Sequence, residues 1–255
     1  MAVFSSHGFD MSYEVWGEGP AVLLIHGFGS TGRVNWVDTG WVRTLETAGY
    51  RAITFDNRGH GASTKFHDPA AYAVPLMAGD ALGLLAHLGI QTAVVMGYSM
   101  GAKIAATLVI GHCEKARAVI LSGLAENMMR PFSDTEIIAE ALETMRPESI
   151  SDPVGKTFRA FGEQTGSDLR ALAACMRGSR TPILPEELAA IAVPALVVAG
   201  SDDPTAGAVE PLVKVIPGAE GVVLPRRNHM NAVGDRGHKD AVLRFLHKID
   251  APERA

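Results

Sequence analysis

A serine at the centre of a Gly-x-Ser-x-Gly pattern is the residue of this 255-residue chain best suited to nucleophilic chemistry. The pattern spans residues 97–101 around Ser99, follows the apolar run Ala93–Met96 and precedes small residues suited to a helix. A tight strand-to-helix turn exposes such a hydroxyl, and the N-terminal end of the helix favours developing negative charge. The five-letter pattern is weak alone, but its flanks predict a nucleophilic Ser99 at such a turn.

A glycine-rich turn follows an earlier apolar strand. The residues His26-Gly27-Phe28-Gly29 come directly after Ala21–Ile25. Glycine lets backbone N–H groups approach a bound oxygen closely, which is what an oxyanion hole requires. The alternative is a turn that only ends the strand, but His-Gly-x-Gly is uncommon in ordinary turns.

These motifs resemble the α/β-hydrolase superfamily, and within it the small lid-bearing serine hydrolases such as esterases and enol-lactonases. The resemblance covers nearly the whole chain and rests on residues 13–20, 26–30, 56–63, 97–101, 197–204 and 228–230. It implies a triad in the order serine, acid, histidine. Two departures are visible: Ala102 stands where many relatives have glycine, and Asn228 precedes the histidine instead of glycine.

The base expected to activate the serine is His229, which falls in a loop after the last predicted strand and before the C-terminal helix. An imidazole has an ordinary pKa of about 6.5, so it can accept a proton at neutral pH and return it later. Four other histidines are expected to have structural or solvent-exposed positions and no catalytic role. His26 and His60 are expected to brace their turns, whereas His238 and His247 are expected to face solvent.

The acid expected to orient the imidazole is a buried carboxylate at a strand end. Asp203 matches the family spacing Gly-x-x-Asp counted from Gly200 and directly precedes Pro204. Asp202 is the alternative, with turn capping as its other role. Asp235 is a more distant third candidate.

The resulting chemistry is acyl transfer. The backbone N–H groups of Phe28 and Met100 are expected to form the oxyanion hole. Ser99 would attack a carbonyl carbon while His229 takes its proton, an alcohol would leave, and water would then release the acyl group. Serine at this turn argues against haloalkane dehalogenase or epoxide hydrolase chemistry, which in relatives uses a carboxylate nucleophile.

Strands and helices alternate along the chain, which predicts an α/β fold with a mostly parallel, doubly wound sheet. Strands are expected at Ser12–Trp16, Ala21–His26, Ala52–Asp56, Ala93–Tyr98, Ala118–Ser122, Ala195–Gly200 and Gly221–Leu224. Helices are expected at Val42–Ala48, Leu76–Leu88, Ala102–Ile110, Val209–Val215 and Lys239–Lys248. We expect one domain over residues 1–255.

Helical signals replace this alternation in residues 124–192, where the family inserts a lid that shapes the substrate pocket. Ser133–Glu136 has the pattern of a capping box that opens a helix through Met145. Further helices are expected at Thr157–Phe161, Asp168–Met176 and Pro185–Ile191. Asp134, Glu136, Glu140 and Glu143 are expected on a solvated face, and an apolar roof is expected from Met128, Met129, Phe132, Phe158, Phe161 and Met176.

Composition excludes several classes of protein. The net charge of −5 argues against a nucleic-acid partner and against attraction to anionic membranes. Two cysteines imply no disulfide framework, and no run approaches the ~18 apolar residues of a membrane span. The N-terminus lacks the basic start and apolar core of a signal peptide, so we expect a cytoplasmic protein. No metal motif or dinucleotide fingerprint appears, and no cofactor is expected.

The expected substrate is a small, largely apolar ester or lactone. Lys103, Arg130, Arg177 and Arg180 are candidates to bind a substrate carboxylate, although solvated surface charge is the simpler interpretation of each. Two alternatives stay open. The same triad serves carbon–carbon bond hydrolases and thioesterases, and a non-catalytic ligand receptor can retain an intact triad.

Overall fold

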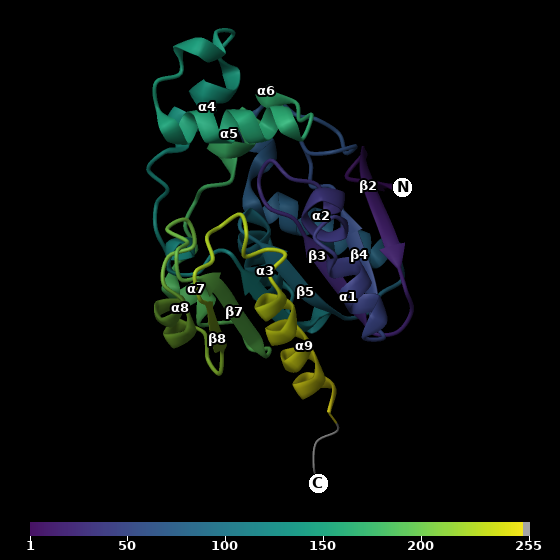
Figure 1. The fold of residues 1–255 in the computed structure, drawn as a ribbon. Helices are drawn as coiled ribbons and strands as arrows, with labels where there is room; N and C mark the ends of the chain where they lie inside the picture. Colours follow the sequence, from purple (N-terminus) through teal and green to yellow (C-terminus); the bar gives the residue numbers. More distant parts are fainter. Residues whose placement is uncertain (252–255) are drawn as a thin grey trace.

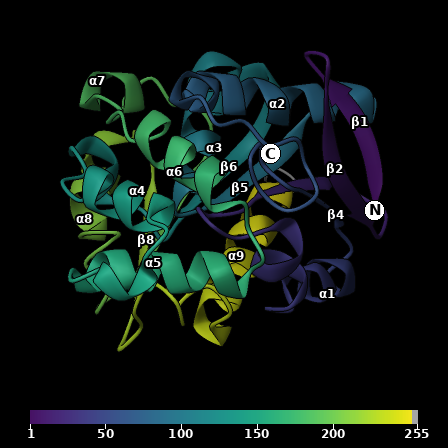
Figure 2. The ribbon, with the colours of Figure 1, turned by 90° about the horizontal axis from the view of Figure 1, so that it is seen from above.

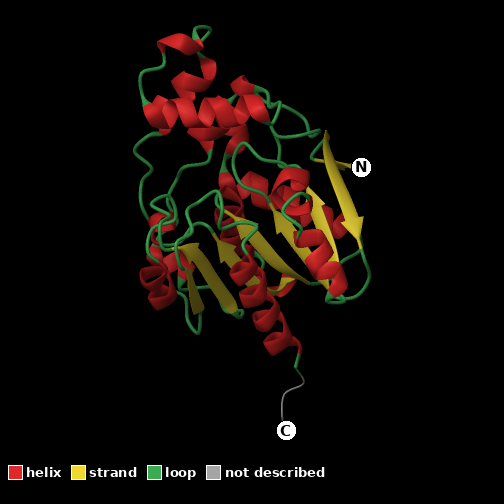
Figure 3. Ribbon diagram, in the orientation of Figure 1, coloured by secondary structure: helices red, strands yellow, loops and turns green. Residues whose placement is uncertain are grey.

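An eight-stranded sheet forms the centre of the protein, for which the computed structural model describes residues 1–251. The strand order is β1-β2-β4-β3-β5-β6-β7-β8, with β1–β2 and β2–β4 antiparallel and the remaining pairs parallel (Figures 1 and 3). The strands are β1 Ala2–Ser6, β2 Phe9–Trp16, β3 Ala21–Ile25, β4 Arg51–Phe55, β5 Ala93–Tyr98, β6 Ala116–Ser122, β7 Ala195–Gly200 and β8 Glu220–Leu224. The mostly parallel sheet agrees with the sequence prediction.

Helices cover both faces of the sheet (Figure 2). On one face lie α1 (Trp41–Thr47) and α9 (Arg236–Asp250). On the other lie α2 (Val74–His87), α3 (Met100–Gly111) and α8 (Val209–Val215). Because both faces are covered, β3, β5 and β7 are buried at every residue, which explains their unbroken apolar runs.

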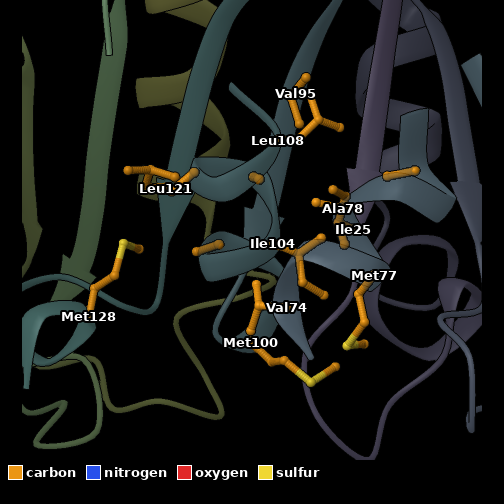
Figure 4. Packing of buried hydrophobic residues seen from close by; sticks show 14 of the residues in the cluster. Ile25, Val74, Met77, Ala78, Val95, Met100, Ile104, Leu108, Leu121 and Met128 are labelled. Atoms are coloured by element: carbon orange, nitrogen blue, oxygen red, sulfur yellow. The ribbon is translucent and has the colours of Figure 1, made fainter. Parts of the chain in front are cut away.

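The contact between β5 and α3 fixes the turn that holds Ser99. Val95 of β5 belongs to the same buried cluster as Met100, Ile104 and Leu108 of α3 (Figure 4). A helix packed along its own preceding strand leaves the connecting turn little freedom. The direction in which the serine points is therefore set by the core.

Residues between β6 and β7 form α4 (Thr135–Glu143), α5 (Pro153–Gln164) and α6 (Leu169–Gly178), which lie above the carboxyl ends of the parallel strands (Figure 1). The short α7 (Pro185–Leu188) lies lower, beside α8. Arg177 of α6 donates to Glu136 and Glu143 of α4, with nitrogen–oxygen distances of 2.9 to 3.0 Å, and so ties the two helices together.

Two local predictions are wrong. No strand was predicted at β1, because Phe4 is its one buried apolar side chain. Antiparallel pairing with β2 holds this strand in the sheet. The predicted capping box is absent, because Asp134 is the residue that caps α4 and its side chain accepts no bond from the helix. Ser133 instead donates to the carboxylate of Asp134.

Other boundaries agree closely. The predicted bounds of β5, β7 and α8 match those observed. The predicted domain extends to residue 255, and residues 252–255 lie outside the described part. Across residues 1–251, no helix combines the length and apolar character that crossing a membrane would need.

Candidate active site

The turn between β5 and α3 holds Ser99 in an unusual backbone conformation. Its φ of 55° and ψ of −118° are strained for a residue with a side chain. A Cβ at Gly97 would lie 2.0 Å from the carbonyl oxygen of Gly101, and one at Gly101 would lie 2.0 Å from that of Ile25. Both glycines are therefore required sterically, as the five-residue pattern predicts. The result presents the hydroxyl of Ser99 at the N-terminal end of α3.

His229 lies within hydrogen-bond distance of this serine. Its Nε2 is 3.0 Å from Ser99 Oγ, and its Nδ1 is 2.9 Å from Asp203 Oδ2 and 3.1 Å from Oδ1. In the neutral ring, Nδ1–H donates to the carboxylate and Nε2 accepts from the hydroxyl. The structure thus brings together three side chains that are 130 residues apart at most.

The loop that carries His229 is held by hydrogen bonds of the Asn228 and Tyr98 side chains. Asn228 Oδ1 accepts hydrogen bonds from the backbone N–H groups of Met230 and Asn231, at 3.0 and 3.1 Å. Asparagine in place of the family's glycine therefore stabilises the turn through its side chain. Tyr98 donates its hydroxyl to the carbonyl oxygen of His229 at 2.6 Å. Burial raises the pKa of Tyr98, which keeps this donor protonated.

The three candidate acids have different surroundings. Asp203 is buried, and besides facing His229 it accepts a hydrogen bond from the backbone N–H of Ala206 at 3.0 Å. Asp202 is exposed, and within residues 1–251 its carboxylate accepts only from the hydroxyl of Ser201, at 2.8 Å. Asp235 caps α9 and pairs with Arg227. Asp203 is thus the one of the three that contacts the imidazole.

Hydrogen bonds from the side chains of His26 and Asn35 hold the backbone of the turn after β3. Asn57 N–H donates to His26 Nε2 at 2.9 Å, so Nδ1 carries the hydrogen and donates to the carbonyl oxygen of Gly27 at 2.8 Å. Asn35 Oδ1 accepts from Gly27 N–H at 3.0 Å. These contacts confirm the bracing role predicted for His26.

The two backbone N–H groups predicted to form the oxyanion hole have no hydrogen-bond acceptor within residues 1–251. Within residues 1–251, the backbone N–H of Phe28 makes no hydrogen bond, and Met100 is the first residue of α3, where the N–H has no partner in the helix. A Cβ at Gly27 would lie 3.3 Å from Ser99 Cβ, so the loop that carries Phe28 lies directly against the serine.

Three histidines are buried and neutral. Burial lowers the pKa of His26 to about 4 and that of His238 to about 4. Burial, followed by the neighbouring ring of His26, lowers the pKa of His60 to about 3, and His60 Nδ1 donates to the carbonyl oxygen of Arg58 at 2.9 Å. The prediction that His238 faces solvent is wrong, because its ring bonds Ser122 and packs 4.8 Å from the Trp41 ring.

This burial predicts that acid destabilises the protein. The unfolded histidines take up protons near pH 6.5, whereas the folded ones do so only near pH 4 or below, so stability is complete above pH 6.5 and falls as the pH drops. The expected loss is about 1.4 kcal/mol per pH unit for each buried histidine. Urea unfolding at several pH values between 7.5 and 5 measures it.

Two histidine variants of α9 test whether buried His238 contributes to the acid destabilisation. His238→Phe should flatten the slope of unfolding free energy against pH, whereas His247→Gln, at an exposed position of α9, should leave the slope unchanged. An unaltered slope in His238→Phe would mean that another group produces the acid sensitivity.

Apolar side chains from the helices between β6 and β7 lie over the site. The ring of Phe158 lies 5.8 Å from that of Phe28, and Phe161 lies against Gly29. Cys175 Sγ of α6 is 3.7 Å from Met100 Sδ. The predicted roof is partly core, since Met128 and Met176 are fully buried.

The four candidate cations differ in their pairing. Arg130 pairs with Glu126, and Arg177 with Glu136 and Glu143. Lys103 is buried, so the prediction of a solvated charge is wrong for it, and it donates to the carbonyl oxygen of Thr181 at 3.1 Å. Arg180 pairs with no carboxylate in residues 1–251.

Sequence reasoning missed the roles of Tyr98 and Asn35. Tyr98 lies inside the Gly-x-Ser-x-Gly pattern, but its contact with the histidine loop depends on tertiary structure. Asn35 carries no local signal at all. In the described part of the chain, no group of three or more His, Cys, Asp or Glu residues is positioned to hold a metal ion.

Comparison with known proteins defines the class. A family profile described as "alpha/beta hydrolase fold" matches residues 20–174, more than half of the chain. The chain belongs to this family, and it is an enzyme of the hydrolase class.

Individual relatives carry several activities in their names. A non-heme haloperoxidase from Rhodococcus erythropolis is 28% identical over 260 residues, covering 89% of this chain and 92% of its own length. Epoxide hydrolase B from Mycobacterium tuberculosis is 34% identical over 106 residues, which is 40% of this chain and only 28% of that protein.

Solved structures match along nearly the whole chain. The enol-lactonase from Burkholderia xenovorans has a TM-score of 0.76 at 24% identity and covers 97% of this chain and 99% of its own, which shows the common fold. A thermophilic esterase from Thermogutta terrifontis, solved with malate bound, has a TM-score of 0.77 at 25% identity and covers 98% of this chain and 97% of its own.

Proposed function

We propose that this enzyme is a serine hydrolase that cleaves a small carboxylic ester or lactone through an acyl-enzyme intermediate. The observation that carries the proposal is the continuous hydrogen-bonded path from Ser99 Oγ to His229 Nε2, at 3.0 Å, and from His229 Nδ1 to Asp203, at 2.9 Å. A serine hydroxyl is a weak nucleophile at neutral pH and needs such a base.

In the first half of the reaction, Ser99 Oγ attacks the carbonyl carbon while His229 Nε2 accepts the hydroxyl proton. The negative charge that develops on the carbonyl oxygen is stabilised by the N–H groups of Phe28 and Met100. The imidazolium then gives its proton to the departing alcohol, and the carbon–oxygen bond of the ester breaks. For a lactone, the alcohol stays attached to the acyl group.

In the second half, water attacks the acyl carbon while His229 accepts its proton. The bond between that carbon and Ser99 Oγ then breaks, the imidazolium returns the proton to Oγ, and the acid product leaves. Asp203 holds the ring in the tautomer that can accept the serine proton and stabilises the imidazolium. Its burial strengthens this interaction, because the surrounding dielectric constant is low. We assign residues 124–192 the role of a lid within a single domain, since Phe158 and Phe161 lie over the loop that carries Phe28.

The name of one relative raises epoxide hydrolysis as an alternative. Attack of a serine oxygen on an epoxide carbon would leave an alkyl ether on the enzyme, which water and a histidine do not cleave. An ester formed on serine is readily hydrolysed. Serine at position 99 therefore favours acyl transfer over epoxide opening.

Labelling with a fluorophosphonate probe, combined with a series of p-nitrophenyl esters, lactones, acyl-CoA thioesters and vinylogous diketones, tests the proposal. We expect the probe to label the wild type and not Ser99→Ala, and we expect esters or lactones to be turned over fastest. Fastest turnover of thioesters or diketones would replace the proposed substrate class. Labelling without any turnover would favour the non-catalytic receptor.

A further inference from the structure

An arginine without a carboxylate partner lies beside the loop that carries the proposed oxyanion donor. Arg180 follows α6, and its guanidinium carbon is 5.1 Å from the centroid of the Phe28 ring and 5.1 Å from that of Phe132. Two aromatic rings therefore lie within cation–π distance of the guanidinium, an arrangement favourable for a cation. Hydrogen bonds from this side chain come from the N–H groups at the edge of the guanidinium plane.

Little of the hydrogen-bonding capacity of that edge is used within residues 1–251. The Nε of Arg180 donates to the weakly accepting sulfur of Met176 at 3.1 Å, and Nη2 is buried without an acceptor. No oxygen atom of residues 1–251 accepts a hydrogen bond from this guanidinium. Leaving a buried guanidinium nitrogen without an acceptor is costly, so a ligand that supplies one would bind favourably.

The position of Arg180 is fixed by a second cation. The ammonium of Lys103, one helical turn after Ser99 on α3, donates to the carbonyl oxygens of Arg180 and Thr181, at 3.5 and 3.1 Å. Burial and then the charge of Arg180 lower the pKa of Lys103 to about 8. The backbone of Arg180 is thus anchored to the helix that begins at the nucleophile.

Two sets of contacts lead from Arg180 to the turn that holds Ser99. Phe28, which stacks on Arg180, follows Gly27, and Gly27 lies against Ser99. Met100, which follows Ser99, contacts Cys175 on the helix that leads into Arg180. Arg180 therefore contacts the residue of one proposed oxyanion donor, Phe28, and follows the helix that contacts the other, Met100.

We propose that Arg180 is a substrate-binding residue, and that the preferred ester or lactone carries a free carboxylate that the edge of its guanidinium binds. The planar fork of a guanidinium matches the two oxygens of a carboxylate. This inference rests on the proposed function, and it names the substrate class. Among the other arginines of residues 124–192, Arg130, Arg159 and Arg177 already pair with glutamates, and Arg146 and Arg170 are exposed.

Hydrolysis of two matched probes tests the proposal. Mono-p-nitrophenyl glutarate carries a free carboxylate, and its methyl ester has the same chain without the charge. We expect the wild type to prefer the acid, and Arg180→Met to lower the acid-to-methyl-ester ratio of kcat/KM by about 10- to 100-fold, mainly through KM. Methionine keeps the apolar contacts with the two rings.

Arg130→Met is the matched control, since it removes the same charge from an exposed arginine paired with Glu126. It should leave the ratio unchanged. An equal loss on both probes in Arg180→Met would assign Arg180 a packing role, and an equal loss of ratio in Arg130→Met would assign the preference to overall charge. Either result, or no preference in the wild type, overturns the proposal.

Binding to the inactive protein separates this inference from the proposed function. Calorimetric titration of Ser99→Ala with monomethyl glutarate should show binding that the additional change Arg180→Met weakens at least about tenfold. If neither probe is hydrolysed by the wild type, the proposed function fails, yet this titration still decides the role of Arg180. Equal binding to both proteins overturns it.

Discussion

Ser99→Ala should lower kcat for the best ester substrate by at least about three orders of magnitude, with the fold intact. The hydroxyl oxygen, 3.0 Å from His229 Nε2, is the atom that would form the bond to the acyl carbon, and alanine removes it. Steady-state kinetics with a chromogenic ester measure the loss. His229→Ala should reduce kcat to a similar level, because without the base the hydroxyl keeps its proton.

The two losses should not add. Residues that act as one unit show non-additive effects, so Ser99→Ala combined with His229→Ala should be about as slow as either single change. Ser133→Ala, at an exposed serine of the proposed lid, is the matched control and should keep wild-type activity. Near-normal turnover in Ser99→Ala, at unchanged thermal stability, would exclude the proposed mechanism.

Asp203→Asn should lower kcat by about three to four orders of magnitude. The Ala206 N–H donates to Asp203 Oδ1, so the amide oxygen of asparagine would occupy that position and its NH₂ group would face His229 Nδ1. Nδ1 would then accept a hydrogen bond, the hydrogen would move to Nε2, and the ring could no longer take the serine proton. The measurement is kcat alongside the thermal midpoint of unfolding.

The neighbouring residue supplies an isosteric control. Asp202→Asn changes an exposed carboxylate that accepts a hydrogen bond from Ser201 and does not bond the imidazole, so kcat should stay within about threefold of wild type. The reverse outcome, with Asp202→Asn severe and Asp203→Asn mild, would transfer the acid role to Asp202. Equal mild effects would mean that the imidazole does not depend on a carboxylate.

The elements that carry the site are well predicted because their signals are local. The bounds of β5 and β7 follow from continuous apolar runs that end at glycine-rich turns, and buried parallel strands need such runs on both faces. The turn at Ser99 is equally local, because its two glycines satisfy steric limits imposed by atoms nearby. In contrast, β1 depends on pairing with β2, and its sequence lacks the apolar pattern that predicts a strand.

Side-chain burial was the least predictable property. His238 has a helical position like that of His247, but the packing of α9 against the sheet buries one and exposes the other. Lys103 resembles any helical lysine in sequence, and only the chain at Arg180 and Thr181 provides the carbonyl oxygens that bind it. Such partners come from segments that the sequence does not place together.

The sequence nominated Ser99, Asp203 and His229 through turns that follow predicted strands, together with the triad order and the Gly-x-x-Asp spacing that the resemblance to α/β-hydrolases implies. Tertiary structure decided which of Asp202 and Asp203 contacts the imidazole, because that depends on the direction in which the loop after β7 turns. It also decided that Arg180 has no acidic partner among residues 1–251. Turn geometry is encoded by neighbours in sequence, whereas charge pairing and burial depend on segments that meet only in the folded protein.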